Sequence, residues 1–297
     1  MKRLSIPLPD NFSFHHTVRS HGWYDLRPFV VTDDDKLTTV LSRGKDGGPV
    51  SVTISAAPSK IKIDVNADEL DTDGIKLDVA HILRFDEDFE TFYGHIEKLE
   101  KIQWAKEART GRLLRGPNVW EDLVKTLCTT NCTWALTKIM VNNLVDLLGE
   151  TTPCGRKAFP TAEAMAAQNE IFYREKAKTG YRSPFVVELA QKVASGELDP
   201  QAWLTSDLST SDLKKEMKKV KGVGDYAAEN LLKLVGRYDG LALDSWLRGG
   251  FYEKHNKGKK CKDSKIERHY NKFGEWRGLA IWCDMTEDWF GEKGRNS

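Results

Sequence analysis

Apolar and polar residues alternate along three short segments near the start of the chain, at 36–42 (KLTTVLS), 50–54 (VSVTI) and 61–65 (IKIDV). The turn-forming sequences KDGGP and AAPS separate these segments. Alternation with a period of two is typical of strands that bury one face. The pattern therefore predicts that residues 1–83 form a β-rich unit.

From residue 84 onward the apolar spacing becomes that of helices. Residues 117–148 carry apolar side chains at helical intervals, which predicts two packed amphipathic helices. Another helix is expected to open at Pro160 or Thr161, because proline and threonine favour helix starts. Further helical segments are expected at 84–109, 185–194, 200–204, 211–220 and 274–290. Residues 254–265 are predicted to form a lysine-rich loop.

The segment 220–248, VKGVGDYAAENLLKLVGRYDGLALDSWLR, carries the strongest local signal. Gly222 and Gly224 bracket Val223, and glycine permits a sharp turn with positive φ and a close approach to a partner. The N–H groups at the start of the next helix, at 225–228, have no acceptor within that helix. Such a helix start is a ready site for an anion, and a phosphate group suits it.

The 297-residue chain has a formal net charge of only +1. The charge is uneven, because residues 211–270 hold 15 Lys or Arg against 9 Asp or Glu, a net of +6. A basic face on a nearly neutral protein is typical of a nucleic-acid site, and an ordinary solvated surface is the alternative. Beside the glycine hairpin we favour nucleic acid.

Composition narrows the class of protein further. No apolar run approaches the roughly 20 residues that span a bilayer, and the start of the chain lacks the apolar core of a signal peptide, so we expect an intracellular protein without membrane contact. The odd count of five cysteines and the lack of a C-x-x-C motif argue against disulfides and structural zinc. Cys128 and Cys132 share one helix face, where packing is expected.

Asp244 follows Gly224 by twenty residues and stands at the head of the next expected helix. This arrangement resembles the helix-hairpin-helix (HhH-GPD) superfamily of DNA glycosylases, in its eight-oxoguanine and 3-methyladenine glycosylase II branch. The resemblance implies an α+β, mostly α-helical fold: an antiparallel β-domain (1–83) and two helical subdomains, 84–115 with 236–297, and 116–235. The active site is expected in the cleft between the helical subdomains.

The resemblance also implies a partner and an interface. The partner would be double-stranded DNA with a damaged base, bound by a monomer. The hairpin residues expected at the DNA backbone are Lys221, Gly222, Val223, Gly224, Asp225, Tyr226 and Ala227. Family hairpins often hold a Na⁺ or K⁺ ion, for which the carbonyls of Lys218, Val220 and Val223 would serve. No other cofactor is expected, and the four-cysteine iron–sulfur loop of some branches is absent from the sequence.

Residues that meet the base opposite the lesion are expected by the same resemblance. The segment 112–131 looks like the family segment that ends in a Cys-small-small-Asn turn, whose asparagine maps onto Asn131. In Gly-Tyr-Arg at 180–182, Tyr181 would wedge into the base stack and Arg182 would read the orphaned base. A second arginine of this reading set maps onto Leu136, which predicts weaker reading here.

Three departures from the family pattern indicate the chemistry. Members that also cut the DNA strand carry a lysine where this chain has Tyr226, and tyrosine cannot form a Schiff base. The chain therefore looks monofunctional. The lesion-pocket glutamine maps onto Gly278 and the stacking phenylalanine onto Trp282. These departures make the site look closer to alkyladenine-type members than to those that read eight-oxoguanine.

Asp244 is the expected catalytic carboxylate, since a carboxylate beneath C1′ stabilises the oxocarbenium character of glycosidic cleavage. The alternative is a helix N-cap, worth about 1 kcal/mol. Tyr226, Trp246 and Trp282 are expected to stack on the flipped base, and a cationic alkylated purine would gain roughly 0.5–2 kcal/mol of cation–π energy. Core packing of these aromatic side chains is the alternative.

Other interpretations stay open at this point. The lesion could be an oxidised, deaminated or mismatched base, the chain could be a non-catalytic binder of damaged DNA, or another lysine could supply lyase chemistry. His15, His16 and His21 lie close together in the sequence without a nearby cysteine or carboxylate pattern, so metal binding is not expected. We expect them at the domain junction with Trp23.

Overall fold

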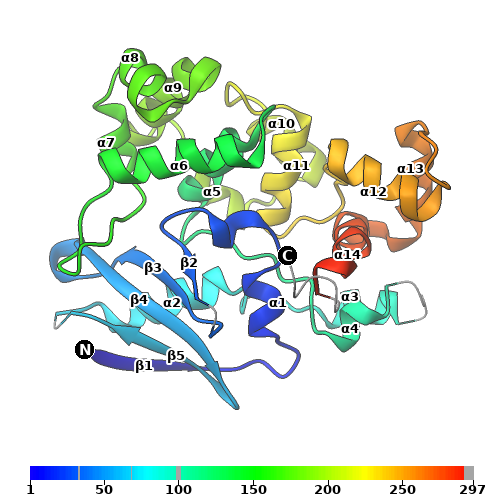
Figure 1. Cartoon of the computed structure of the whole chain (residues 1–297), viewed down its shortest axis with the longest axis horizontal. Coiled ribbons are helices and arrows are strands. Elements are labelled where there is room, and N and C mark those ends of the chain that lie inside the picture. Colours follow the sequence, from blue (N-terminus) through cyan, green and yellow to red (C-terminus); the bar gives the residue numbers. More distant parts are fainter. Residues whose placement is uncertain (33, 68, 98–101, 291–297) are drawn as a thin grey trace.

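The computed structural model describes residues 1–32, 34–67, 69–97 and 102–290. An N-terminal sheet occupies one side of the molecule, and the helices that follow occupy the rest (Figure 1). The mostly helical α+β class that was predicted is confirmed.

The sheet contains β1 (Lys2–Pro7), β2 (Val30–Val31), β3 (Leu37–Ser42), β4 (Pro49–Ala57) and β5 (Lys60–Val65). Its order is β1-β5-β4-β3-β2, and every neighbouring pair is antiparallel. Ile63 lies opposite Leu4 on one side and Ile54 on the other. The three predicted strands are thus confirmed, and the sheet also gains β1 and the two-residue β2.

Two α-helices lie inside the region predicted to be β-rich, the short α1 (Phe14–Val18) and a longer helix near its end. Helix α2 (Thr72–Ile82) begins at Asp71, whose side chain accepts a hydrogen bond from the Gly74 N–H at 2.9 Å. Ile75, Val79 and Ile82 recur at helical spacing and are fully buried. Helix α2 therefore covers the sheet that the alternating segments form.

The two predicted helices of 117–148 are α5 (Val119–Thr129) and α6 (Trp134–Leu148). Thr161 caps the next helix by accepting from the Ala164 N–H at 3.2 Å. The remaining α-helices are α3 (Glu90–Ile96), α4 (Trp104–Glu107), α7 (Ala162–Ala166), α8 (Glu170–Phe172), α9 (Ser183–Ala194), α10 (Thr210–Met217), α11 (Asp225–Leu234), α12 (Ser245–His255), α13 (Asp263–Tyr270) and α14 (Arg277–Phe290).

Short 3₁₀ segments and one π-helical segment, η3, complete the list: η1 (Gly22–Asp25), η2 (Lys45–Gly47), η3 (Tyr173–Ala177), η4 (Gly180–Arg182), η5 (Pro200–Thr205) and η6 (Asn271–Trp276). The lysine-rich loop is shorter than predicted, because α12 continues to His255 and α13 begins at Asp263. The helical stretch expected at 84–109 is two short helices, and its residues 98–101 lie outside the described part of the chain.

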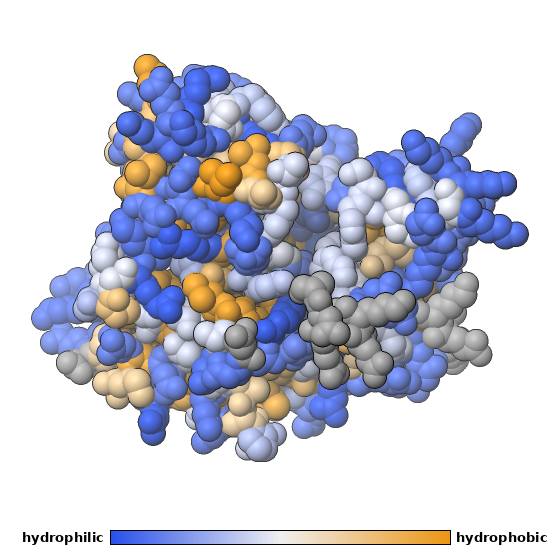
Figure 2. All heavy atoms as spheres, in the orientation of Figure 1, coloured by the Kyte–Doolittle hydropathy of each residue, from blue (hydrophilic) through white to orange (hydrophobic). Residues whose placement is uncertain are grey.

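Buried apolar side chains form two clusters. One joins the sheet and α2 to α5, α6, α9 and α11, and the other joins α3 to α12, α13 and α14. The domain boundaries expected from the resemblance stay a prediction. On the face shown in Figure 2, apolar side chains gather at the upper left, and the right-hand end is hydrophilic.

A buried arginine connects the two clusters. Arg84 is fully buried and donates hydrogen bonds to the carbonyls of Lys233 (2.7 Å) and Leu234 (3.0 Å), the last residues of α11. It also donates to Leu113 O at 2.6 Å and to the Tyr238 hydroxyl at 2.9 Å. Cations favour helix C-termini because the last carbonyls there lack partners. Arg84 therefore fixes the end of α11.

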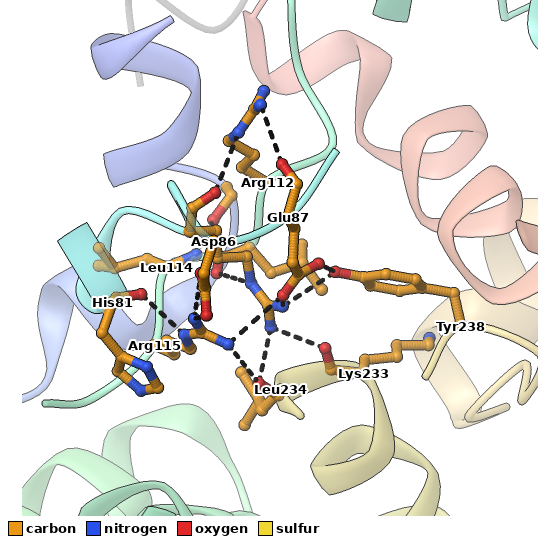
Figure 3. Close-up of polar contacts among 12 residues, drawn as sticks. His81, Asp86, Glu87, Arg112, Leu114, Arg115, Lys233, Leu234 and Tyr238 are labelled. Carbon is orange, nitrogen blue, oxygen red and sulfur yellow. Dashed lines mark hydrogen bonds and ion pairs between the residues drawn. The ribbon is translucent and has the colours of Figure 1, made fainter. Parts of the chain in front are cut away.

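Three further charged side chains lie around this contact. Arg115 donates to His81 O at 2.7 Å and pairs with Asp86, and Glu87 accepts from the Tyr238 hydroxyl (Figure 3). Arg84 also pairs with Glu87. Both Arg84 and Arg115 are thus ion-paired and hydrogen-bonded, as burial of a charge requires. The network holds both the end of α11 and the start of the segment that leads to Asp244.

Candidate active site

The hairpin between α10 and α11 needs glycine at one of its two glycine positions. Gly222 has φ +88°, and a Cβ there would lie 2.7 Å from Leu127 Cδ1 and 2.8 Å from Phe185 Cδ2. Both the backbone angle and the contact exclude a side chain. Gly224 has φ −88° and open space around it, so the positive φ expected for both glycines occurs only at Gly222.

The start of α11 offers unpartnered N–H groups. Gly224 is the N-cap and provides no side-chain cap, while its carbonyl accepts the Ala228 N–H at 2.9 Å. In the described part of the chain, the N–H groups of Asp225, Tyr226 and Ala227 have no hydrogen-bond acceptor. Val223 and Ala227 have buried side chains, so only their backbone could touch a ligand. This geometry suits an anion.

The lysines around the hairpin are ion-paired. Lys214 and Lys218 approach Asp225 at 3.1 and 3.0 Å, and hydrogen bonds from Lys218 and Lys214 lower the pKa of Asp225. Lys219 pairs with Glu216 at 2.7 Å, and Lys221 pairs with Glu188 at 2.6 Å. The hairpin is therefore much less cationic than its lysine count indicates.

The cation expected at the hairpin carbonyls stays a prediction. The Val220 carbonyl accepts the Val223 N–H at 3.0 Å, which closes the turn.

Asp244 caps α12. Its Oδ1 accepts a hydrogen bond from the Leu247 N–H at 2.7 Å, and its side chain is half-buried. The cap that was the alternative interpretation is present. It leaves the second carboxylate oxygen without a hydrogen-bond donor among the described residues, so a cap and a catalytic role are compatible.

The segment before Asp244 is held from three sides. Ala242 has φ +52°, a left-handed conformation that costs a non-glycine residue of order 1 kcal/mol. Its N–H donates to Glu229, and the Leu241 carbonyl accepts from Lys233 Nζ at 3.1 Å. Arg248 donates to Leu243 O at 3.2 Å. Side chains of α11 and α12 thus fix the approach to Asp244.

Gly278 is buried against backbone. Its N–H donates to Tyr238 O at 2.7 Å. A Cβ at Gly278 would lie 1.9 Å from Gly240 O. The position assigned to the base pocket is therefore a close contact between the start of α14 and the segment that leads to Asp244.

Lys233 was not predicted. It is 2% exposed, and burial lowers the pKa of its ammonium to about 8, while the neighbouring carboxylates of Glu229 and Asp244 act in the opposite direction. It follows Tyr226 by seven residues on α11, so the two side chains share one face of the helix. One feature of the sequence could have indicated its burial, because Lys233 stands among apolar residues that recur at helical spacing in α11.

Tyr226 stands beside Asp244. Its side chain is half-buried and also interacts with Thr129 at the end of α5. Burial first, and then the charge of Asp244, raise the pKa of the Tyr226 phenol. The structure thus brings together the expected carboxylate and the residue that stands in place of the Schiff-base lysine.

Three tryptophans cluster near this carboxylate. Trp246 lies two residues after Asp244, and its ring centroid is 5.8 Å from that of Trp282 and 5.3 Å from that of Trp289. Trp282 and Trp289 lie 5.7 Å apart and perpendicular to each other. Trp246 and Trp289 are each 43% exposed, so these rings are open to a ligand. Trp289 was missed because it lies near the end of the last helix.

Trp282 also reaches the N-terminal region. Its Nε1–H donates to Ser20 O at 2.9 Å. Nearby, Trp23 donates to Asp122 at 2.6 Å, and its ring lies 4.8 Å from that of His21. His21 itself contacts the Leu114 carbonyl. The segment around His21 therefore contacts distant parts of the chain, and its expected place at a domain junction stays a prediction.

Asn131 and Tyr181 meet at the surface. Asn131 has φ +46°, and its Nδ2 lies 3.3 Å from the Tyr181 hydroxyl. Tyr181 is 49% exposed. Leu136 is 38% exposed on α6. Their expected contacts with DNA stay predictions.

Arg182 is placed differently from what was expected. It is 2% exposed, and its guanidinium donates to Leu127 O at 3.2 Å, to Thr130 Oγ1 at 3.1 Å and to the Thr130 carbonyl. These are groups at the C-terminal end of α5, which a cation stabilises. In this structure Arg182 supports the turn that carries Asn131 and is not open to a base.

The cysteines are all free, and Cys132 Sγ contacts Cys128 O at 3.2 Å. Among the described residues, no helix has the length and apolar character needed to cross a membrane.

Comparison with solved structures gives the fold. The structure named MBOgg1, solved with a low-affinity DNA ligand, matches with a TM-score of 0.76 at 20% identity, over 96% of both chains. A 3-methyladenine DNA glycosylase from Archaeoglobus fulgidus matches with a TM-score of 0.79 at 16% identity, over 97% of this chain and 99% of that one.

An 8-oxoguanine glycosylase/lyase from Clostridium acetobutylicum, solved with DNA that has cytosine opposite 8-oxoG, matches with a TM-score of 0.73 at 16% identity, over 96% of this chain and 97% of that one. No family model and no curated protein sequence matches the chain. The chain has the fold of the helix-hairpin-helix DNA glycosylases, as its sequence resemblance indicated.

Proposed function

We propose that this protein is a monofunctional DNA glycosylase of base-excision repair that hydrolyses the N-glycosidic bond of an alkylated purine. The observation that carries the proposal is the position of Asp244. Its half-buried carboxylate caps α12, its charge raises the pKa of the Tyr226 phenol, and it precedes Trp246 of the tryptophan group by two residues. Double-stranded DNA is the partner, and we retain a monomer with an intracellular location as parts of the proposal.

The reaction follows from this geometry. The C1′–N bond breaks, and its electron pair leaves with the base. The Asp244 carboxylate stabilises the positive charge that develops on the sugar. Water then adds at C1′ and loses a proton, which leaves an abasic site. A base that already carries a positive charge is a better leaving group, so one carboxylate and a stacking surface suffice.

The tryptophans support a cationic base. Trp246, Trp282 and Trp289 present rings in different orientations within 6 Å of one another. The face of an aromatic ring attracts a cation, and tryptophan does so best. An alkylated purine with positive charge gains from such contacts, while a neutral oxidised purine gains only from stacking. The similar fold of a 3-methyladenine glycosylase agrees with this choice.

A base-release assay tests the proposal. Duplexes that each carry one modified base are incubated with the protein and then analysed with and without alkali. Strand breaks that appear only after alkali, on duplexes with alkylated purine, are the expected result. Release of only oxidised or mismatched bases would contradict the choice of lesion. DNA binding without any base release would instead favour a non-catalytic binder.

A second candidate function is base removal with strand cleavage. Its support is Lys233, a buried lysine whose pKa burial lowers to about 8 although the charge of Asp244 acts in the opposite direction. A lysine that is partly neutral near pH 8 could attack C1′ and form a Schiff base. Borohydride would then trap a covalent complex with DNA, and Lys233→Gln would abolish it. We expect no trapped complex, because the Lys233 ammonium is buried and donates to Leu241 O.

A further inference from the structure

The surface loop between α12 and α13 and the exposed side of α13 carry cations without ionic partners. Five lysines and one arginine are exposed between residues 257 and 268: Lys257, Lys259, Lys260, Lys262, Lys265 and Arg268. In the described part of the chain, no acidic side chain lies within 4.0 Å of the cationic nitrogens of these six residues. We call these six residues the free-cation patch.

Of the acidic residues nearby, Asp263 and Asp284 are engaged by other side chains, whereas Glu253 and Glu267 are exposed. Asp263 accepts two hydrogen bonds from Arg248, at 2.9 and 2.8 Å. Asp284 is 3% exposed and contacts Lys254 at 2.8 Å and His255 at 2.7 Å. Residues 256–268 hold six Lys or Arg against two Asp or Glu, a net of +4. The patch therefore keeps most of its positive charge.

A hollow of about 550 Å³ lies within this patch. Its lining side chains are Phe251, His255, Lys265, Arg268 and His269, so no acid lines it. His255, His269 and Asp284 offer ligand atoms within 4.8 Å of one another, which is close enough for a metal ion. The Asp284 carboxylate already forms an ion pair with the Lys254 ammonium, and this ammonium would repel a metal ion. The charges around the hollow suit an anion.

Helix α12 joins this patch to the candidate active site. Asp244 caps one end, and the patch follows the other end at His255. Eleven helical residues span about 16 Å, which corresponds to about five base-pair steps of duplex DNA. In Figure 1, α12 and α13 lie on the same upper side of the view as α11, and the right-hand end of Figure 2 is hydrophilic.

From these observations we infer that the free-cation patch is a second DNA contact, which binds backbone phosphates a few base pairs away from the extruded base. The inference rests on the proposed function, since it takes duplex DNA as the partner. The hollow between Lys265 and Arg268 receives one phosphate, and the lysines at 257–262 follow the strand beyond it. These contacts strengthen binding without reading sequence.

The test is the salt dependence of DNA binding. Lysine contacts with phosphate release counterions, and each contact contributes about 0.9 to the slope of log K against log salt. The triple variant Lys257→Gln, Lys259→Gln, Lys260→Gln should bind a 25-base-pair duplex more weakly and flatten this slope by roughly two to three. All three side chains are exposed, so the fold should be unaffected; thermal unfolding checks this.

A matched control removes equal charge elsewhere. Lys2, Lys60 and Lys62 lie on β1 and β5, and they also have no ion-pair partner among the described residues. The variant Lys2→Gln, Lys60→Gln, Lys62→Gln should keep the slope of the unmodified protein. Equal slopes for all three proteins would overturn the inference, and equal losses in both variants would show a general charge effect and overturn it too.

Further measurements distinguish a failure of the proposed function from a failure of this inference alone. If the unmodified protein does not bind DNA at all, the proposed function fails, and this inference fails with it. If DNA binds, trimming the duplex on one side of the lesion should erase the difference between the patch variant and the unmodified protein. Saturable binding of inorganic phosphate at the patch, with an unchanged DNA slope, would assign the hollow to a free anion and contradict the inference.

Discussion

Two groups of lysines in this chain have similar counts and opposite surroundings. Around the hairpin, Lys214, Lys218, Lys219 and Lys221 all pair with carboxylates. In the loop after α12 and on α13, the free-cation patch has no such partners among the described residues. An exposed ion pair contributes little to stability, but it does reduce the field that an approaching phosphate meets. The hairpin therefore presents backbone N–H groups to a phosphate, whereas the free-cation patch presents positive charge.

This comparison separates the carboxylate that performs the chemistry from the groups that bind the DNA backbone. Asp244→Asn changes the first and gives the largest expected effect. Base release should fall by two to three orders of magnitude or more, because the developing charge on the sugar loses its carboxylate. DNA affinity and its salt slope should stay close to those of the unmodified protein. Single-turnover base release and equilibrium binding measure the two quantities. Glu163→Gln, an exposed acid on α7 without an ion-pair partner among the described residues, is the control. Unchanged release by Asp244→Asn would remove Asp244 from the mechanism.

The hairpin backbone can be broken at Gly222. Gly222→Ala should lower the free energy of unfolding by roughly 2–4 kcal/mol and weaken DNA binding, because φ is +88° and the methyl group meets Leu127 and Phe185. Gly196→Ala is the control, since Gly196 has φ +76° but open space around it. Chemical denaturation and DNA titration give both readouts. A Gly222→Ala protein as stable as Gly196→Ala would contradict the packing argument.

Lys233 represents a third environment for lysine, a buried one. The pKa of Lys233 in the folded protein, about 8, lies below the ordinary value of 10.5, so the unfolded chain holds more protons between these values. The free energy of unfolding should therefore rise by roughly 2–3 kcal/mol from pH 8 to pH 10.5, relative to a Lys233→Met variant. Denaturation at several pH values in this window measures the difference. Parallel curves for the two proteins would refute the low pKa.

The smallest predicted effect comes from removing the carboxylate that pairs with a hairpin lysine. Glu188→Gln removes the partner of Lys221 at 2.6 Å, so DNA binding should tighten and its salt slope should steepen by up to about one. Glu163→Gln, an exposed acid on α7, removes the same charge without releasing a lysine and should have less effect. If both variants behave alike, ion pairing does not mask Lys221.

Local patterns in the sequence predicted a large part of this structure. Alternation located β3, β4 and β5, and helical spacing located α5 and α6, since both periods depend on neighbouring residues alone. The hairpin and the position of Asp244 at a helix start were also predicted correctly. β1 was missed because an edge strand with only Leu4 and Ile6 as clearly apolar positions gives a weak signal.

The candidate site was predicted less completely. Tyr226, Asp244, Trp246 and Trp282 were named from the sequence, and the structure gathers them. Arg182 was expected to read a base, but it binds carbonyls at the end of α5. Gly278 was expected in the pocket, but it packs against Gly240. In both cases the deciding partner lies tens of residues away.

The sequence by itself determined the periodic elements, the hairpin and the type of chemistry that Asp244 can perform, because these depend on residue type and short spacing. The tertiary structure decided which charged side chains are exposed without an ion-pair partner and which are paired or buried. Lys221 is masked by Glu188, Lys233 is buried near Asp244, and the end of α11 is held by Arg84. Burial and ion pairing depend on residues that only folding brings together, so no local pattern could reveal them.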